Sequence, residues 1–141
     1  MTTWYLLNQE SRSGPFNMAM DEFLLTQDLP PVLRLYQWDV PTLSLGFSQQ
    51  VDRHVNVNAA TEKKVPIVRR LTGGKAVLHS NELTYSVTGP VTQSPFDRQL
   101  LDSYQEIARA FIMAFKHLGI PAEMASRETR AARGGVTSCF A

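Results

Sequence analysis

A run of residues near the middle of the chain combines basic side chains, a glycine pair and a histidine. It reads RRLTGGKAVLH and spans Arg69 to His79. Paired glycines accept positive φ and let backbone amides approach a ligand, and consecutive amides in such a turn bind anions. Arg70 and Lys75 would add fixed positive charge, and Arg70 is expected to line the site rather than Arg69. The pattern favours binding of a phosphate or carboxylate on a small ligand.

On these residues alone a second interpretation stays open, because a surface hairpin with glycines at its turn has the same pattern and is common. Two phosphate-binding motifs are excluded. No GK[ST] follows after four intervening residues, so the loop is not a P-loop. The third glycine and the following helix of a dinucleotide fingerprint are also missing. His79, with Glu82 close by, fits either a place near the ligand or a hydrogen-bonded strand end.

Short stretches of alternating or continuous apolar residues predict the strands around this loop. The predicted strands span residues 4–7, 32–36, 42–47, 65–69, 76–79 and 83–88. A turn at 80–82 joins the last two as a pair, and the strand at 65–69 leads into the glycine turn. The stretch from 54 to 64 is ambiguous, since its first part alternates like a strand and its second part suits a helix.

Apolar residues at three- and four-residue steps predict helices over 16–27 and 97–118. Pro15 suits the first turn of the first helix, on which Asp21 and Glu22 are expected to face outward. Gly119 is expected to cap the second helix. Large apolar side chains on both helices are expected in the core: Phe16, Met20, Phe23, Phe111 and Phe115. Grouped strands with two flanking helices predict an α+β or mixed α/β fold.

The composition narrows the class of protein. The 141 residues fit one domain, and 43% hydrophobic with 19% charged residues is a globular balance. A net charge of +1 does not indicate nucleic acid or anionic lipid as a partner. One cysteine excludes an internal disulfide, and the N-terminal apolar run is too short for a signal peptide. We therefore expect a cytoplasmic protein without a membrane span.

The sequence RRLTGGKAVLH, followed by ELTYSV at 82–87, closely resembles the signature of the lipoate–protein ligase and octanoyltransferase family. That family is related to biotin protein ligases and shares the core fold of class II tRNA synthetases. Three more stretches resemble the family in the same order, at 16–22, 36–46 and 133–140. The resemblance covers nearly the whole chain. It implies an α+β fold with a mixed or antiparallel sheet flanked by helices.

Two residues distinguish the branches of this family. Its ATP-dependent ligases usually carry a third glycine where this chain has Lys75 and generally lack a Cys-Phe pair near position 139. Its cysteine-dependent octanoyltransferases usually carry a basic residue and that pair, so the chain resembles this branch most. The resemblance implies transfer of an octanoyl group from acyl carrier protein, through a cysteine thioester, to a lysine of a lipoyl domain or glycine cleavage H protein.

The resemblance also assigns roles to residues. Cys139 is the implied nucleophile, because a thiolate attacks a thioester at little energetic cost. His79 and Lys75 are candidates to support its thiolate. The residues implied to bind substrate are Arg70, Leu71, Thr72, Gly73, Gly74, Lys75, Ala76, Val77 and Tyr85. We expect the acyl chain in an apolar tunnel beside the glycine turn, walled by Leu43, Val77 and Tyr85.

No metal or cofactor is expected, and ATP with Mg²⁺ would be needed only if the protein is a lipoate–protein ligase. A third alternative is a non-catalytic half of a split protein that binds acyl groups or carrier domains. Family members are longer and continue with a glycine-lysine strand whose lysine is catalytically central. The resemblance therefore implies that residues 1–141 are the N-terminal part of a catalytic domain, inactive alone and truncated to an open sheet edge.

Overall fold

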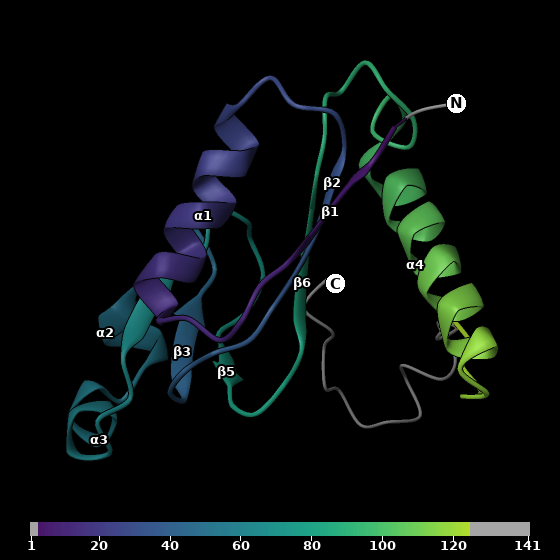
Figure 1. Ribbon diagram of the computed structural model, residues 1–141. Coiled ribbons are helices and arrows are strands. Elements are labelled where there is room, and N and C mark those ends of the chain that lie inside the picture. The colour runs from purple at the N-terminus through teal and green to yellow at the C-terminus, as the bar shows by residue number, and fades with distance from the viewer. Residues whose placement is uncertain (1–2, 125–141) are drawn as a thin grey trace. The chain divides into compact units, whose positions relative to one another are not determined.

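The computed structural model describes residues 3–124 (Figure 1). The chain divides into two compact units, one over Thr3–Gly89 and one from Pro90 onward. Every strand of the described residues lies in the first unit, together with helices α1, α2 and α3. The described helix of the second unit is α4 (Leu100–His117).

The first sheet contains β1 (Tyr5–Asn8), β2 (Val32–Tyr36) and β6 (Thr84–Thr88), with β2 in the centre. β1 runs parallel to β2, whereas β6 runs antiparallel to it and places Ser86 opposite Arg34. The buried face of β2 therefore carries a charged residue between two apolar ones, at positions 32, 34 and 36.

The second sheet has β3 (Thr42–Leu45) in its centre, with β4 (Ile67–Arg69) parallel on one side and β5 (Val77–His79) antiparallel on the other. The segments before and after the glycine turn are thus separated by β3, so the turn is not a hairpin. The expected pair of strands around 80–82 is also wrong, because β5 and β6 belong to different sheets. Asn81, with φ 49°, lies in the turn between them.

Helix α1 (Gly14–Thr26) begins as predicted, with proline in its first turn and the Ser13 hydroxyl accepting a hydrogen bond from the amide of Phe16. Its orientation differs from the prediction. Phe16 and Phe23 are 41% and 55% exposed, whereas Asp21 points toward β2 and forms an ion pair there. The helix turns this polar face inward because the buried face of β2 carries Arg34, which needs partners.

The ambiguous stretch forms two short helices, α2 (Val51–His54) and α3 (Val57–Glu62). Asn56 caps α3, since its Oδ1 accepts a hydrogen bond of 3.0 Å from the amide of Ala59. This local cap stabilises a helix start. Lys64, with φ 54°, then turns the chain toward β4.

In the second unit, α4 confirms the predicted amphipathic helix, and Gly119 follows it with φ 72°. The Ser103 hydroxyl donates to the carbonyl oxygen of Pro95 over 2.7 Å. Phe111 is half-buried, whereas Phe115 is 40% exposed and so is not a core residue. Among the described residues no helix is long and apolar enough to cross a membrane. The predicted α+β class with mixed sheets is confirmed.

Candidate functional site

The glycine turn lies against the end of β3. The amide of Arg70 donates to the carbonyl oxygen of Leu45 over 2.8 Å, and the amide of Phe47 donates to that of Thr72 over 2.9 Å. A Cβ added to Gly46 would lie 2.0 Å from the carbonyl oxygen of Gly74. This close approach between two backbone segments requires glycine at position 46.

The two glycines of the turn differ in backbone conformation. Gly74 has φ 96°, in the region that L side chains rarely adopt. Gly73 lies outside that region, and an added Cβ there would meet nothing within 4 Å. The backbone conformation therefore explains why position 74 is a glycine. At position 73 there is open space for a side chain beside the turn.

Arg69 lies beside the turn but binds the neighbouring loop. Its Nη1 donates to the carbonyl oxygens of Gly46, Phe47 and Gln49 at 3.0, 2.9 and 2.7 Å. These contacts hold the chain where it leaves β3. Arg69 is accordingly a scaffold residue, and the glycine turn itself is held by Arg70.

Arg70 reaches back across its own turn. Its Nη2 donates to the carbonyl oxygens of Gly73 at 3.2 Å and Lys75 at 2.8 Å. The N–H and C=O of a trans peptide point in opposite directions. The amides of Gly74 and Ala76 therefore point away from the guanidinium, on a loop whose residues 71–75 are exposed. The turn can present backbone donors to a ligand, as the sequence pattern favours.

A buried polar chain continues from Arg70 into the sheet. Its Nη1 donates to Ser44 Oγ over 2.6 Å, and Ser44 Oγ lies 2.6 Å from His79 Nε2. His79 Nδ1 lies 2.6 Å from Glu82 Oε1. Ser44 is fully buried and His79 is 7% exposed. The structure thus links His79 and Arg70 through Ser44, which no sequence pattern had marked as a site residue.

Trp38 completes the surroundings of the histidine. Its ring stacks on the His79 ring, with centroids 4.1 Å apart and planes 12° from parallel. Its Nε1 donates to Thr84 Oγ1, which donates to Glu82 Oε1, each over 2.8 Å. The aromatic face and the carboxylate fix the imidazole in one orientation. No sequence signal marks the contacts of Trp38, since its partners His79 and Thr84 lie far from it in the sequence.

The other predicted site residues lie in two places. Leu71, Thr72 and Lys75 are exposed on the turn, and Ala76 and Val77 are half-buried where it enters β5. Tyr85 lies in the first sheet, opposite Leu35. Cys139 lies outside the residues that the structure describes.

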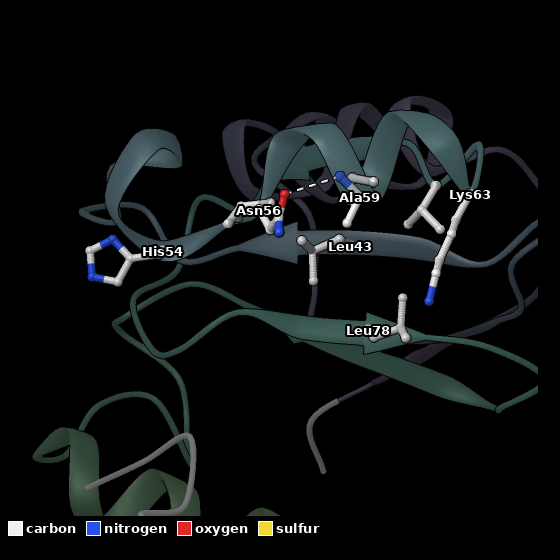
Figure 2. A pocket seen from close by; sticks show the side chains of 9 residues that line it. Leu43, His54, Asn56, Ala59, Lys63 and Leu78 are labelled. Atoms are coloured by element: carbon white, nitrogen blue, oxygen red, sulfur yellow. Dashed lines mark hydrogen bonds between the residues drawn. The ribbon is translucent and has the colours of Figure 1, made fainter.

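An apolar hollow of about 240 Å³ lies beneath α3 (Figure 2). Figure 2 shows Leu43 and Leu78 on neighbouring strands, with Lys63 reaching toward Leu78. The register pairs Leu43 with Leu78 and Ser44 with Val77. Successive strand residues face opposite sides. Leu43 and Val77 therefore cannot wall one tunnel, which corrects that expectation.

The fold and the glycine turn agree with the family to which the sequence assigns the chain. Residues 13–138 match the lipoyl protein ligase A/B catalytic domain, and the chain belongs to that family. The chain is 39% identical to the octanoyltransferase LipM of Lysinibacillus sphaericus, covering 98% of this chain and 51% of that protein. It is 42% identical to the LipM of Carboxydothermus hydrogenoformans, covering 89% and 48%. The chain spans about half the length of the curated relatives it matches.

Solved structures show the same fold. The bipartite lipoate protein ligase of Thermoplasma acidophilum, studied with its E2 lipoyl domain, superposes with a TM-score of 0.76 at 23% identity, covering 89% of this chain and 49% of that one. A lipoate-protein ligase A bound with ATP superposes with a TM-score of 0.70 at 23% identity, covering 89% and 51%. These likenesses confirm the predicted ligase-type fold.

Proposed function

We propose that the protein transfers an octanoyl group from acyl carrier protein to a lysine of a lipoyl domain or of glycine cleavage H protein, in the cytoplasm. The observation that carries this proposal is the identity of about 40% with octanoyltransferases, which extends over nearly the whole chain. Lys75 in place of a third glycine supports the transferase branch over the ATP-dependent ligases.

The proposed chemistry has two steps. The Cys139 thiolate attacks the thioester carbonyl of the octanoyl carrier. As the new thioester forms, the carrier's pantetheine sulfur leaves as a thiolate, which takes up the proton that Cys139 had lost. The lysine amine of the acceptor then attacks that thioester. An amide forms as the bond to the Cys139 sulfur breaks, and the proton that the amine loses passes to the departing thiolate and restores the Cys139 thiol. Neither step consumes ATP.

The glycine turn would contribute electrostatic stabilisation. Each attack places negative charge on the carbonyl oxygen, and backbone donors fixed in advance stabilise such charge. The amides of Gly74 and Ala76 point away from Arg70 on an exposed loop, which supports this role. Lys75 on the same loop adds a positive charge.

A comparison of two octanoyl donors tests the proposed function. The protein as its gene encodes it is incubated with an apo lipoyl domain and either octanoyl carrier protein or free octanoate with ATP and Mg²⁺. Mass spectrometry should find octanoylated lipoyl domain with the carrier alone. Transfer only with the free acid and ATP, or with lipoate and ATP, would identify a ligase. Binding of carrier or lipoyl domain without transfer from either donor would identify a non-catalytic binding protein.

A further inference from the structure

We propose that Ser44 is a positioning residue of this acyl transfer, which sets the tautomer of His79 and couples the imidazole to the glycine turn. The inference rests on the proposed function for its kinetic part only. Ser44 lies in the middle of the second sheet, opposite Val77 of β5. Its hydroxyl is fully buried between two nitrogen partners at 2.6 Å.

Which atom carries each proton follows from what each side chain can donate or accept. A guanidinium only donates, so Ser44 Oγ accepts from Arg70 Nη1. The hydroxyl proton of Ser44 is then available to His79 Nε2, which must accept it. The remaining ring proton sits on Nδ1 and is donated to Glu82 Oε1. The chain of hydrogen bonds is satisfied by a neutral imidazole with its proton on Nδ1.

The alternative tautomer fits poorly. A proton on His79 Nε2 would make Ser44 Oγ accept two donors, and its own proton would need a third contact. Within residues 3–124 the hydroxyl of Ser44 makes hydrogen bonds to Arg70 and His79 alone. Leaving a buried hydroxyl proton without an acceptor is unfavourable, because the group has lost its hydrogen bond to water. The serine therefore selects one tautomer.

The same serine joins the histidine to the turn. Arg70 Nη1 binds both the hydroxyl and the carbonyl oxygen of Ser44, the latter at 3.0 Å, while Nη2 binds the carbonyls of Gly73 and Lys75. One planar group thus fixes the turn and the serine together. A shift of the Ser44 hydroxyl would move both the guanidinium and the imidazole.

This arrangement changes the role expected for His79. Both ring nitrogens are engaged within the protein, and the ring is buried against Trp38. A general base for a thiol needs a nitrogen within hydrogen-bond reach of that thiol. His79 instead acts through the position of its neighbours, with Ser44 and Glu82 holding it at either nitrogen.

The test compares Ser44→Ala with Thr42→Val. Thr42 is also fully buried, lies on the same face of β3, and donates its hydroxyl to the carbonyl of Val40 at 3.0 Å. Thr42 lies opposite His79 in the strand register, so both variants remove one buried hydroxyl from a neighbour of this histidine, and only the hydroxyl of Ser44 hydrogen-bonds to it. We expect octanoyl transfer to fall roughly 10- to 100-fold in Ser44→Ala and to stay near the wild-type rate in Thr42→Val.

Nitrogen NMR of labelled imidazoles supplies the second readout, which does not depend on activity. His79 should show a protonated Nδ1 and a bare Nε2 in the wild type, and a different or mixed tautomer in Ser44→Ala. Ser44→Thr keeps the hydroxyl and should restore the wild-type pattern. A proton on Nε2 in the wild type would overturn the proposal even if Ser44→Ala failed to fold. Wild-type transfer with an unchanged tautomer in Ser44→Ala would overturn it while leaving the proposed function intact.

Discussion

Two arginine networks lie in the two sheets of the first unit, one around the buried Arg34 and one around the half-buried Arg70, and they differ in what they bind. Arg34 in β2 is fully buried and donates to side chains of the scaffold, at 2.7 Å to Asp21, 2.8 Å to Asn17 and 2.6 Å to Gln9. Arg70 donates to carbonyl oxygens of its own exposed turn and to Ser44. The first network joins elements, whereas the second shapes a loop.

The ion pair between Arg34 and Asp21 lies at the centre of the Arg34 network. Asp21 accepts hydrogen bonds from the Ser86 hydroxyl at 2.6 Å and the Tyr36 hydroxyl at 3.1 Å, in addition to its ion pair with Arg34. The guanidinium carbon also lies 3.8 Å from the centre of the Tyr36 ring. These contacts tie α1 to β2 and β6. The comparison shows that the partners of an arginine decide whether it stabilises the fold, as Arg34 does, or shapes a loop, as Arg70 does.

The largest effect is expected from Arg34→Met. The substitution leaves the Asp21 carboxylate without its cation, and breaking a buried pair in this way costs about 3–5 kcal/mol. Urea denaturation should show this loss in the free energy of unfolding. Arg109→Met is the control, because Arg109 pairs with Glu106 on the exposed side of α4 and surface pairs contribute little. Equal losses in the two variants would contradict the scaffold role of Arg34.

Gly46→Ala should disturb the turn and not the first sheet. Its Cβ would lie 2.0 Å from the carbonyl oxygen of Gly74, so the loop must move. A displacement near 1 Å costs about 100-fold in rate. Initial rates of octanoyl transfer should show this loss. A wild-type rate would mean that the position of the turn does not matter for transfer.

Gly74→Ala and Gly73→Ala form a matched pair on one turn. Position 74 has φ 96°, where an L side chain costs about 1–2 kcal/mol, and position 73 carries no such strain. Thermal unfolding should show the loss in the first variant alone. Similar unfolding midpoints would show that the turn relaxes without strain.

The smallest effect concerns Tyr36 in the Arg34 network. Burial, followed by the charge of Asp21, raises the pKa of Tyr36 above its usual value of 10.0. Above pH 10 the unfolded chain loses this phenolic proton while the folded protein keeps it, so the free energy of unfolding falls as the pH rises. At neutral pH, Tyr36→Phe should lose about 1 kcal/mol through the missing hydrogen bond.

Urea midpoints for wild type and Tyr36→Phe over a pH series measure this difference. The advantage of the wild type should be constant below pH 10 and shrink above it. An advantage that does not change with pH would show that the phenol is not held protonated by the fold.

The periodicity of apolar residues predicted where helices and strands lie better than it predicted which elements pack against one another. The strand at 32–36 and the long amphipathic helix were found because their patterns are local. The expectation that Asp21 faces outward was wrong, because the apolar pattern of a helix cannot reveal an arginine on the strand that packs against it. The pairing of β3 between β4 and β5 was missed because it depends on contacts between distant residues.

In the candidate site, too, the residues of a local motif were predicted and a residue that acts through a distant contact was not. The glycine turn, Arg70 and His79 were predicted from a contiguous motif, although the roles assigned to them stay predictions. Ser44 was not found, because its role arises from a contact with a residue 35 positions away. A serine within an alternating strand looks like any buried small residue until the strand register is known.

Mass spectrometry of the protein after incubation with octanoyl carrier protein tests the central claim most directly. The account predicts a mass increase of one octanoyl group, located on Cys139, removed by hydroxylamine and lost when an apo lipoyl domain is added. In Cys139→Ser the hydroxylamine-sensitive adduct should be absent and transfer should stop. Octanoyl transfer by Cys139→Ser at the wild-type rate would contradict the proposed covalent step.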